Sequence, residues 1–492
     1  MTRDLPTRDT PAATFACAFA AAVLVYFHAL SHFPLHIDTE TQVVIGSIGQ
    51  TIALGRWGIA LLHATVLPEP AVAYFTPLLS LALLAAAAVA AETPFAFPPE
   101  QRWLFVAVFA GFPQFAYQLE FANQSVSLAL GLFCTTAGGA LWLRGGASRR
   151  VAAVALCAFG VGFYQSLLFV MPTLWAAAAL HAVRSRGAST ADVARSGMGA
   201  FALTLAAAVI SVAIARAVQW WCGVPNAGGY LSQMVGWHRD GLAATLWAES
   251  SDLGAYVAGG RFYGNSLYAL APAAAVVVAL SPCGPPVTLA RRVAGVALGI
   301  VTVALPFALI VLLGAPPPPR TYLAEPVAVA ALVTMALGLL PGGTAARGRM
   351  AAGVGAVVLL VACFHVSRLF YADSAALSAD LLLGNRVVET IYRTDPGFDA
   401  ARVPVWFAGA PAIHNVWRGA DYDVFGASFF TWDGGNPMRI GAFLKVAGIA
   451  DLRLASPADI ARIRPAVASL PVWPDPRAVC LIDGVLVVRL GR

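Results

Sequence analysis

The stretch that decides the fold is VAGVALGIVTVALPFALIVLLG, residues 293–314, which carries no charged side chain over its whole length. Two arginines, Arg291 and Arg292, stand directly before it. A helix needs about 20 consecutive apolar residues to cross the hydrocarbon core of a bilayer. The length of the stretch and the cations at its start therefore predict a transmembrane helix.

Apolar runs of this kind recur over the first three quarters of the chain. The sequence is 59% hydrophobic and 11% charged, whereas soluble domains carry about 25% charged residues. We therefore predict a polytopic α-helical membrane protein with about 11 transmembrane helices in a lipid bilayer. The net charge of +6 does not indicate nucleic acid binding. The apolar runs cover residues 12–30, 70–91, 103–119, 121–143, 151–163, 165–182, 197–220, 264–281, 293–314, 322–342 and 350–370.

Arginines in short loops predict which side of the membrane each loop faces, because cytoplasmic loops are enriched in Lys and Arg. We place the N-terminus in the cytoplasm and interpret the first run as an uncleaved anchor. The predicted inner loops then hold Arg3, Arg8, Arg102, Arg144, Arg149, Arg150, Arg184, Arg186, Arg195, Arg291, Arg292, Arg347 and Arg349. The short outer loops hold only Arg56, Arg239, Arg261 and Arg320. This bias favours a cytoplasmic N-terminus and an outward-facing C-terminus.

Residues 151–182 test this topology, because they are short for two crossings and long for one. Arginines flank the segment on both sides, at 149–150 and at 184–186. A single crossing would place one of these groups outside, whereas a tight helical hairpin keeps both inside. The tip of the hairpin falls near GVGFYQS, residues 160–166, where two glycines are expected to loosen the backbone.

The last quarter of the chain differs from the rest, since charge rises and the apolar runs shorten. Residues 374–392 predict an amphipathic helix, and VPVWFAGA (403–410) predicts a strand. We therefore divide the chain into a transmembrane domain, residues 1–370, and a small α/β domain on the outer face, residues 371–492.

Two local signals in the tail are especially clear. Ser456 is typical of a helix N-cap, Pro457 of the first helical position and Asp459 of the first turn. Further on, AVCLIDGVLVVRL predicts a β-hairpin, with Asp483 and Gly484 in a type I′ turn.

Polar side chains that are rare in so apolar a chain gather at the predicted outer side. HIDTET, residues 36–41, places Asp38 and Glu40 just beyond the first helix, and Glu120 lies in the next outer turn. The other members of this set are Arg56, Tyr164, Gln165, Arg216, Arg320 and Arg368. Charged groups at the membrane edge are costly, so they indicate a functional site.

Each of these residues also has a structural interpretation. An outer-loop acid such as Asp38 can simply be solvated, and Glu120 can cap a helix. Arg216 and Arg368 can extend to the lipid headgroups. Arg56 can anchor the chain in the interface beside the tryptophan that follows it.

The sequence indicates neither a metal site nor a nucleotide site. GxGxxG in a strand–helix context and GxxxxGK[ST] are both absent. The outer histidines fit no metal-ligand spacing; they are His32, His36, His63 and His238. A disulfide between Cys222 and Cys480 is left open.

Motifs along most of the chain resemble one known family. They are HIDTET followed by GRW (55–57), YQLE (117–120), FYQS (163–166), and a tail with GIADLRLASPADI (448–460), LPVWP (470–474) and IDGVLVVRL (482–490). In these motifs, in the order of the motifs and in its hydropathy pattern, the chain resembles the bacterial Gtr type II glucosyltransferases of the GT-C superfamily. It departs from the family in having Asp38-Thr39-Glu40 where adjacent aspartates are common, and Glu120 where aspartate is usual.

The resemblance implies a GT-C-like glycosyltransferase of the bacterial inner membrane. Such an enzyme moves a hexose, commonly glucose, from a polyprenyl-phosphate donor such as undecaprenyl phosphate glucose. The acceptor is a cell-envelope glycan, such as the O-antigen of lipopolysaccharide, on the periplasmic face. A lipid-borne donor agrees with the missing nucleotide motifs, since an outward-facing enzyme has no nucleotide sugars to use. The tail would be a periplasmic domain that binds the acceptor, covers the site or is structural.

Enzymes of this superfamily that use such donors are generally inverting, which implies a base for the acceptor hydroxyl and cations for the leaving phosphate. We assign Asp38 as general base and Glu40 as a second acid that orients the acceptor or shares the role. Arg320 is the first choice for the donor phosphate, with Arg216 and Arg56 behind it.

The remaining residues are assigned to the sugar, and no cofactor or metal is expected. Glu120, Tyr164 and Gln165 would contact sugar hydroxyls, and Arg56 would bind substrate beside them. Two other functions stay open. One is a transporter or flippase of lipid-linked saccharides, which predicts charges at mid-membrane depth and internal repeats; the other is a transferase of another sugar.

Overall fold

The computed structural model describes residues 10–32, 35–237, 241–281, 288–341 and 343–491. Four residues of the predictions above lie outside this part of the chain: Arg3, Arg8, His238 and Arg239. The structure divides into two compact units; unit 1 comprises residues 1–31 and 47–367, and unit 2 comprises residues 32–46 and 368–492. HIDTET therefore groups with the tail, whereas the predicted division at residue 370 put it with the transmembrane helices.

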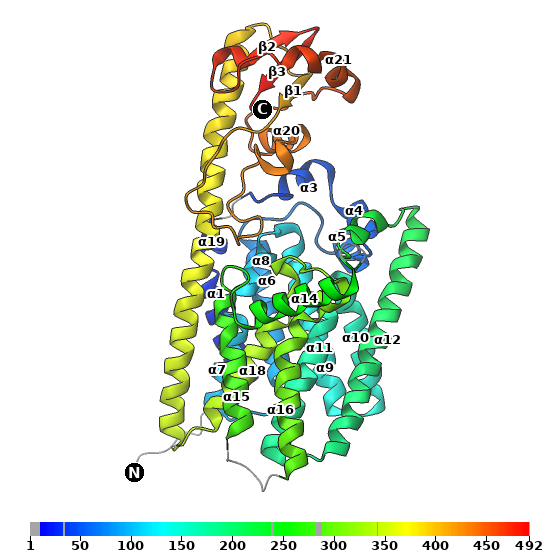
Figure 1. Ribbon diagram of the computed structural model, residues 1–492, viewed down its shortest axis with the longest axis vertical. Coiled ribbons are helices and arrows are strands. Elements are labelled where there is room, and N and C mark those ends of the chain that lie inside the picture. The colour runs from blue at the N-terminus through cyan, green and yellow to red at the C-terminus, as the bar shows by residue number, and fades with distance from the viewer. Residues whose placement is uncertain (1–9, 33–34, 238–240, 282–287, 342, 492) are drawn as a thin grey trace. The chain divides into compact units, whose positions relative to one another are not determined.

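Unit 1 is a bundle of long helices that follow the predicted apolar runs (Figure 1). They are α1 (Pro11–Val25), α6 (Phe75–Glu92), α7 (Pro99–Ala110), α9 (Ala122–Arg144), α10 (Ala147–Phe163), α11 (Val170–His181), α12 (Thr190–Cys222), α15 (Leu270–Leu280), α16 (Leu289–Ala304), α18 (Glu325–Gly338) and α19 (Thr344–Thr394), whose last part, from Arg368, belongs to unit 2. Helix α9 packs against both α6 and α10.

Short helices and single turns connect the long ones. They are α2 (Phe27–Ser31), α4 (Ile48–Ala53), α5 (Trp57–Thr65), η1 (Pro113–Phe115), α8 (Ala116–Leu119), η2 (Gln165–Phe169), η3 (Ala182–Arg186), α13 (Gly228–Gln233), α14 (Leu242–Val257), η4 (Asn265–Ala269), η5 (Leu305–Phe307), α17 (Ala308–Leu313) and η6 (Pro319–Thr321).

The helices have the length and composition of a membrane protein. Among the described residues, 6 helical segments are long and apolar enough to cross a bilayer: Phe75–Glu92, Ala122–Arg144, Gln165–Arg186, Thr190–Cys222, Leu289–Leu313 and Thr344–Thr394. Shorter apolar helices lie at Pro11–Val25, Asn265–Leu280 and Glu325–Gly338. The chain is thus a helical membrane protein, and the number of crossings stays a prediction.

The predicted break near residues 160–166 is confirmed. Helix α10 ends at Phe163, and Tyr164 is extended, with φ −156° and ψ 125°. The turn η2 follows and leads into α11. The helix therefore ends within the segment where the flanking arginines predict the tip of a hairpin.

The role predicted for the two glycines of this segment is wrong. Gly160 and Gly162 lie inside α10 and do not loosen it. A Cβ atom on Gly162 would lie 2.3 Å from the Trp57 ring, and one on Gly160 would lie 2.6 Å from Thr135 Cγ2. These glycines let neighbouring helices approach closely, because any side chain would overlap its neighbours.

This close approach predicts the effect of a substitution. Gly162→Ala should lower the free energy of unfolding by roughly 1–3 kcal/mol, because the rigid Trp57 indole has to move. The melting temperature in detergent, followed by tryptophan fluorescence, measures the loss. Gly353→Ala is the matched control, since a Cβ there meets nothing within 4 Å. Equal stability of the two variants would show that α5 does not depend on this contact.

Unit 2 contains a small sheet covered by helices. Its elements are α3 (Thr39–Ile45), β1 (Val405–Ala408), η7 (Trp432–Gly434), α20 (Pro437–Val446), α21 (Pro457–Val467), η8 (Pro476–Ala478), β2 (Val479–Ile482) and β3 (Val485–Arg489), together with the last part of α19. The strand order is β1-β3-β2, with β1 parallel and β2 antiparallel to β3. Ile463 and Val467 of α21 pack on Ala408, Val485 and Val487 of the sheet.

Both local signals in the tail are confirmed. Ser456 caps α21, and its side chain and that of Asp459 bond reciprocally to each other's backbone N–H groups. Asp483 and Gly484 connect β2 to β3 with φ values of 45° and 78°, as a type I′ turn requires.

Candidate active site

Asp38 and Glu40 lie at the start of α3 in unit 2. Asp38 is the N-cap residue, with φ 78° and ψ −25°, and its carbonyl oxygen accepts a hydrogen bond of 3.0 Å from the Thr41 hydroxyl. A non-glycine residue in this left-handed region is uncommon and often marks a functional constraint. The Asp38 side chain is 40% exposed, whereas that of Glu40 is fully buried. Of the two acids, Asp38 is therefore the one that is accessible to solvent.

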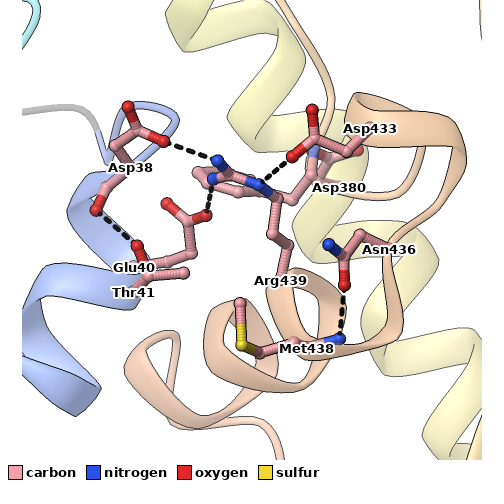
Figure 2. A network of polar contacts seen from close by, with 9 residues as sticks. Asp38, Glu40, Thr41, Asp380, Asp433, Asn436, Met438 and Arg439 are labelled. Atoms are coloured by element: carbon pink, nitrogen blue, oxygen red, sulfur yellow. Dashed lines mark hydrogen bonds and ion pairs between the residues drawn. The ribbon is translucent and has the colours of Figure 1, made fainter. Parts of the chain in front are cut away.

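One arginine, Arg439 near the start of α20, joins the two acids to each other (Figure 2). Asn436 caps this helix by accepting a hydrogen bond of 3.0 Å from the Met438 N–H. The guanidinium donates from Nη2 to Asp38 Oδ1, from Nη1 to Glu40 Oε1 and from Nε to Asp433 Oδ2, each at 2.6 Å. The Arg439 side chain is only 14% exposed.

The electrostatics of this cluster shift the pKa of the Glu40 carboxyl. Burial raises the pKa of the Glu40 carboxyl to about 7, and the nearby Asp38 adds to this rise. The Arg439 guanidinium opposes it. Three carboxylates around one guanidinium leave excess negative charge, which a proton on Glu40 relieves near neutral pH.

A contact between a buried histidine and a buried acid fixes the same segment within unit 2. His36 Nδ1 lies 2.5 Å from Asp373 Oδ2, and both side chains are buried. The other Asp373 oxygen accepts the Gly426 N–H. The His36 ring also meets Phe370 and Phe425 edge to face. His36 is therefore a structural residue that holds the segment against α19.

A further buried acid of α19 supports the loop before η7. Asp380 accepts hydrogen bonds of 2.6 Å from the Ser428 hydroxyl and of 2.7 Å from the Phe429 N–H. Asp373 and Asp380 are seven residues apart, so they lie on one face of the helix. Together they position the chain that leads to Asp433 and Arg439.

In unit 1, the segments that carry Glu120 and Arg320 lie against each other. Glu120 is fully buried at the end of α8. The Gln114 amide donates to the Pro319 carbonyl at 2.9 Å, and the Gln118 amide donates to the Arg320 carbonyl. The Arg320 guanidinium lies over the Phe121 ring, 5.1 Å from its centre. An acid and a cation thus share one region of the unit.

Arg56, Tyr164 and Gln165 form a second group in unit 1. Arg56 follows Gly55, whose φ of 74° separates α4 from α5. Its Nη1 donates to Gln124 Oε1 at 3.0 Å, and its guanidinium lies 4.5 Å from the centre of the Tyr164 ring. The Gln165 amide donates to the Leu54 carbonyl at 2.9 Å. These contacts hold the predicted substrate residues together.

Arg216 belongs to neither group by direct side-chain contact. It is an exposed residue of α12, and its Nη1 lies 3.5 Å from Gln219 Oε1. Gln219 in turn donates to the Ile52 carbonyl at 2.9 Å, next to the turn that carries Arg56. An exposed guanidinium of this kind suits a lipid headgroup as well as a donor phosphate.

Residues 27–337, more than half of the chain, match the family model described as Glucosyl transferase GtrII. The chain belongs to this family. The resemblance to the Gtr type II enzymes is confirmed, and the protein is a membrane glycosyltransferase. Every residue to which a role was assigned lies inside the matched range of this GtrII family member, whereas Arg368, Asp433 and Arg439 lie beyond it. Comparisons with curated proteins and with solved structures found no match.

Sequence reasoning missed Asp433 and Arg439. Arg439 follows an Asn436-Pro437 helix start, a local signal that predicts the helix but not the ion pairs. Its partner Glu40 lies 399 residues away in the sequence. No spacing rule links two such positions, so only the fold reveals them. Cys222 and Cys480, the pair left open above, are both free thiols.

Proposed function

We propose that this enzyme transfers a hexose, in the first instance glucose, from a polyprenyl-phosphate donor to a cell-envelope glycan such as O-antigen. The reaction would take place at the periplasmic face of the bacterial inner membrane and would invert the anomeric configuration. The observation that carries the proposal is the acid pair of α3, in which a half-exposed Asp38 stands beside a fully buried Glu40. The family match supplies the reaction class.

Asp38 is the proposed general base. Its Oδ1 atom bonds to Arg439, and no hydrogen bond from the described residues reaches Oδ2. One oxygen is thus fixed, while the other is available to an acceptor hydroxyl. Proton removal during attack on the anomeric carbon contributes typically 10²- to 10⁴-fold to such reactions. Glu40 adds negative charge behind the base when it is ionised.

Arg320 is the proposed partner of the donor phosphate, with Arg216 and Arg56 as further cations. A planar guanidinium can bind a phosphate through two parallel hydrogen bonds. These arginines would neutralise the leaving phosphate without a divalent metal. Glu120, Tyr164, Gln165 and Arg56 would contact the sugar, and the tail, residues 371–492, would be a periplasmic domain.

Mass spectrometry of the lipids and envelope glycans of cells with and without the protein tests the function. We expect cells that lack it to lose a side-branch hexose and to accumulate the polyprenyl-phosphate hexose. Restoring the wild-type protein should reverse both changes. Unchanged glycans would refute the proposal, and a lost branch without donor accumulation would argue for a different donor.

A further inference from the structure

Arg439 is bound by carboxylates on three sides within unit 2. Its three donor atoms each contact a different acid, at 2.6 Å, and none of these contacts is longer than the others. Two of the acids, Asp38 and Asp433, are partly exposed, at 40% and 48%. Figure 2 shows the guanidinium between the three side chains, two of which come from the start of α3 and one from η7.

The backbone at both exposed acids has an unusual conformation. Asp38 has a φ of 78° and Asp433 a φ of 52°, both in the left-handed region. Gly434 and Gly435 follow Asp433 with φ values of 71° and 80°, which are easily adopted by glycine. Two separate turns are therefore shaped so that each aspartate meets the same guanidinium. Backbone strain of this kind is typical of residues whose placement matters for function.

Charged groups from several elements surround Glu40. Asp38 precedes it at the start of α3, Asp433 lies in η7, and Arg439 comes from α20. Lys445 of α20 is paired with Asp451, so it belongs to another contact. On α19, Asp373 is paired with His36, and Asp380 bonds to Ser428 and Phe429. Arg439 is thus the cation bonded to Glu40 itself.

We propose that Arg439 is a positioning residue of the transfer reaction: it orients Asp38, and its positive charge favours the ionised form of Glu40. This inference rests on the function proposed above. It also gives the C-terminal unit a direct role in the reaction, because the unit supplies both Arg439 and Asp433. Burial raises the pKa of Glu40, and the Arg439 guanidinium acts against this rise, so without Arg439 the Glu40 carboxyl would ionise only at a higher pH.

The decisive experiment compares Arg439→Gln with Arg439→Lys across pH. In proteoliposomes that contain a polyprenyl-phosphate hexose and the glycan acceptor, Arg439→Gln should lower kcat/KM roughly 100-fold at pH 7, because the base is misplaced. The acidic limb of its pH–rate profile should move upward by about one pH unit or more, because the cation that favours ionised Glu40 is gone. The loss should therefore be smaller at pH 9. Arg439→Lys should keep the acidic limb of the profile near its wild-type pH while the rate falls. An ammonium group retains the positive charge but lacks the planar set of N–H donors that a guanidinium offers.

Asp433→Asn supplies a change of opposite sign. Removing a negative charge next to the pair should move the acidic limb downward. Arg477→Gln is the matched control, because Arg477 is an exposed arginine of the same unit that is paired with Asp475; it should behave like the wild type. A rate loss that is equal at every pH, or no loss in Arg439→Gln, would overturn the inference and leave Arg439 a structural residue.

An infrared titration separates this inference from the proposed function. A band of a protonated carboxyl group that is present in the wild type and absent from Glu40→Gln belongs to Glu40. It reports the ionisation of Glu40 without the need for turnover. We expect its midpoint to rise in Arg439→Gln and to fall in Asp433→Asn. No transfer by the wild-type protein would refute the function, and an unshifted midpoint would refute the role of Arg439.

Discussion

Asp38→Asn is expected to lower the rate of sugar transfer roughly 10²- to 10⁴-fold, since the amide cannot accept the proton of the acceptor hydroxyl. The substitution keeps the size of the side chain and an oxygen that can still accept from Arg439, so the fold should persist. Donor binding should stay near the wild-type value, because the phosphate is assigned to arginines of unit 1. Transfer of labelled hexose in proteoliposomes measures the rate, and donor binding is measured in parallel.

Asp451→Asn is the control for this substitution. Asp451 is an exposed acid of unit 2 whose partner is Lys445, so its loss should leave transfer unchanged. Turnover of Asp38→Asn close to the wild-type value would remove Asp38 from the role of base. Loss of donor binding together with transfer would indicate instead that Asp38 helps to hold the donor.

Arg320→Ala is expected to weaken binding of the polyprenyl-phosphate donor by roughly 10- to 100-fold, as typical for the loss of a hydrogen bond to a charged group. Gln114 and Gln118 bond to backbone carbonyl oxygens of Pro319 and Arg320. These bonds survive the substitution, so the turn should keep its shape. Equilibrium binding of a fluorescent polyprenyl phosphate gives the Kd.

Two further variants make the result specific. Arg195→Ala removes an exposed arginine that is paired with Asp192 and should leave donor affinity unchanged. Arg216→Ala should have a smaller effect than Arg320→Ala, because its guanidinium is exposed and loosely held. Unchanged donor affinity in Arg320→Ala would exclude Arg320 from the phosphate site.

The parts of the fold that depend on local sequence could be predicted. Apolar runs gave the helices, because a helix in lipid has to satisfy its own backbone. The cap at Ser456 and the turn at Asp483-Gly484 were predictable, since each needs only a few neighbouring residues. Gly160 and Gly162 were misinterpreted because the effect of a glycine depends on what lies beside it, here Thr135 and the Trp57 ring.

The candidate site could be predicted only in part, for the same reason. Asp38 and Glu40 stood out because charge is scarce in this chain. Their grouping with α20 and with Asp433 was not predictable, because it depends on contacts between residues about 400 positions apart. The helix break at Tyr164 was predicted from the arginine count, but the stacking of Arg56 on that ring required the fold.

The central claim is that a lipid-linked sugar is the donor, and transfer by the purified protein tests it most directly. The protein would be reconstituted in liposomes with the glycan acceptor and either a labelled polyprenyl-phosphate hexose or the matching labelled nucleotide sugar. We predict that label reaches the acceptor from the lipid donor alone, with inverted anomeric configuration. Transfer from the nucleotide sugar, or movement of the intact lipid-linked hexose across the bilayer without transfer, would contradict the account.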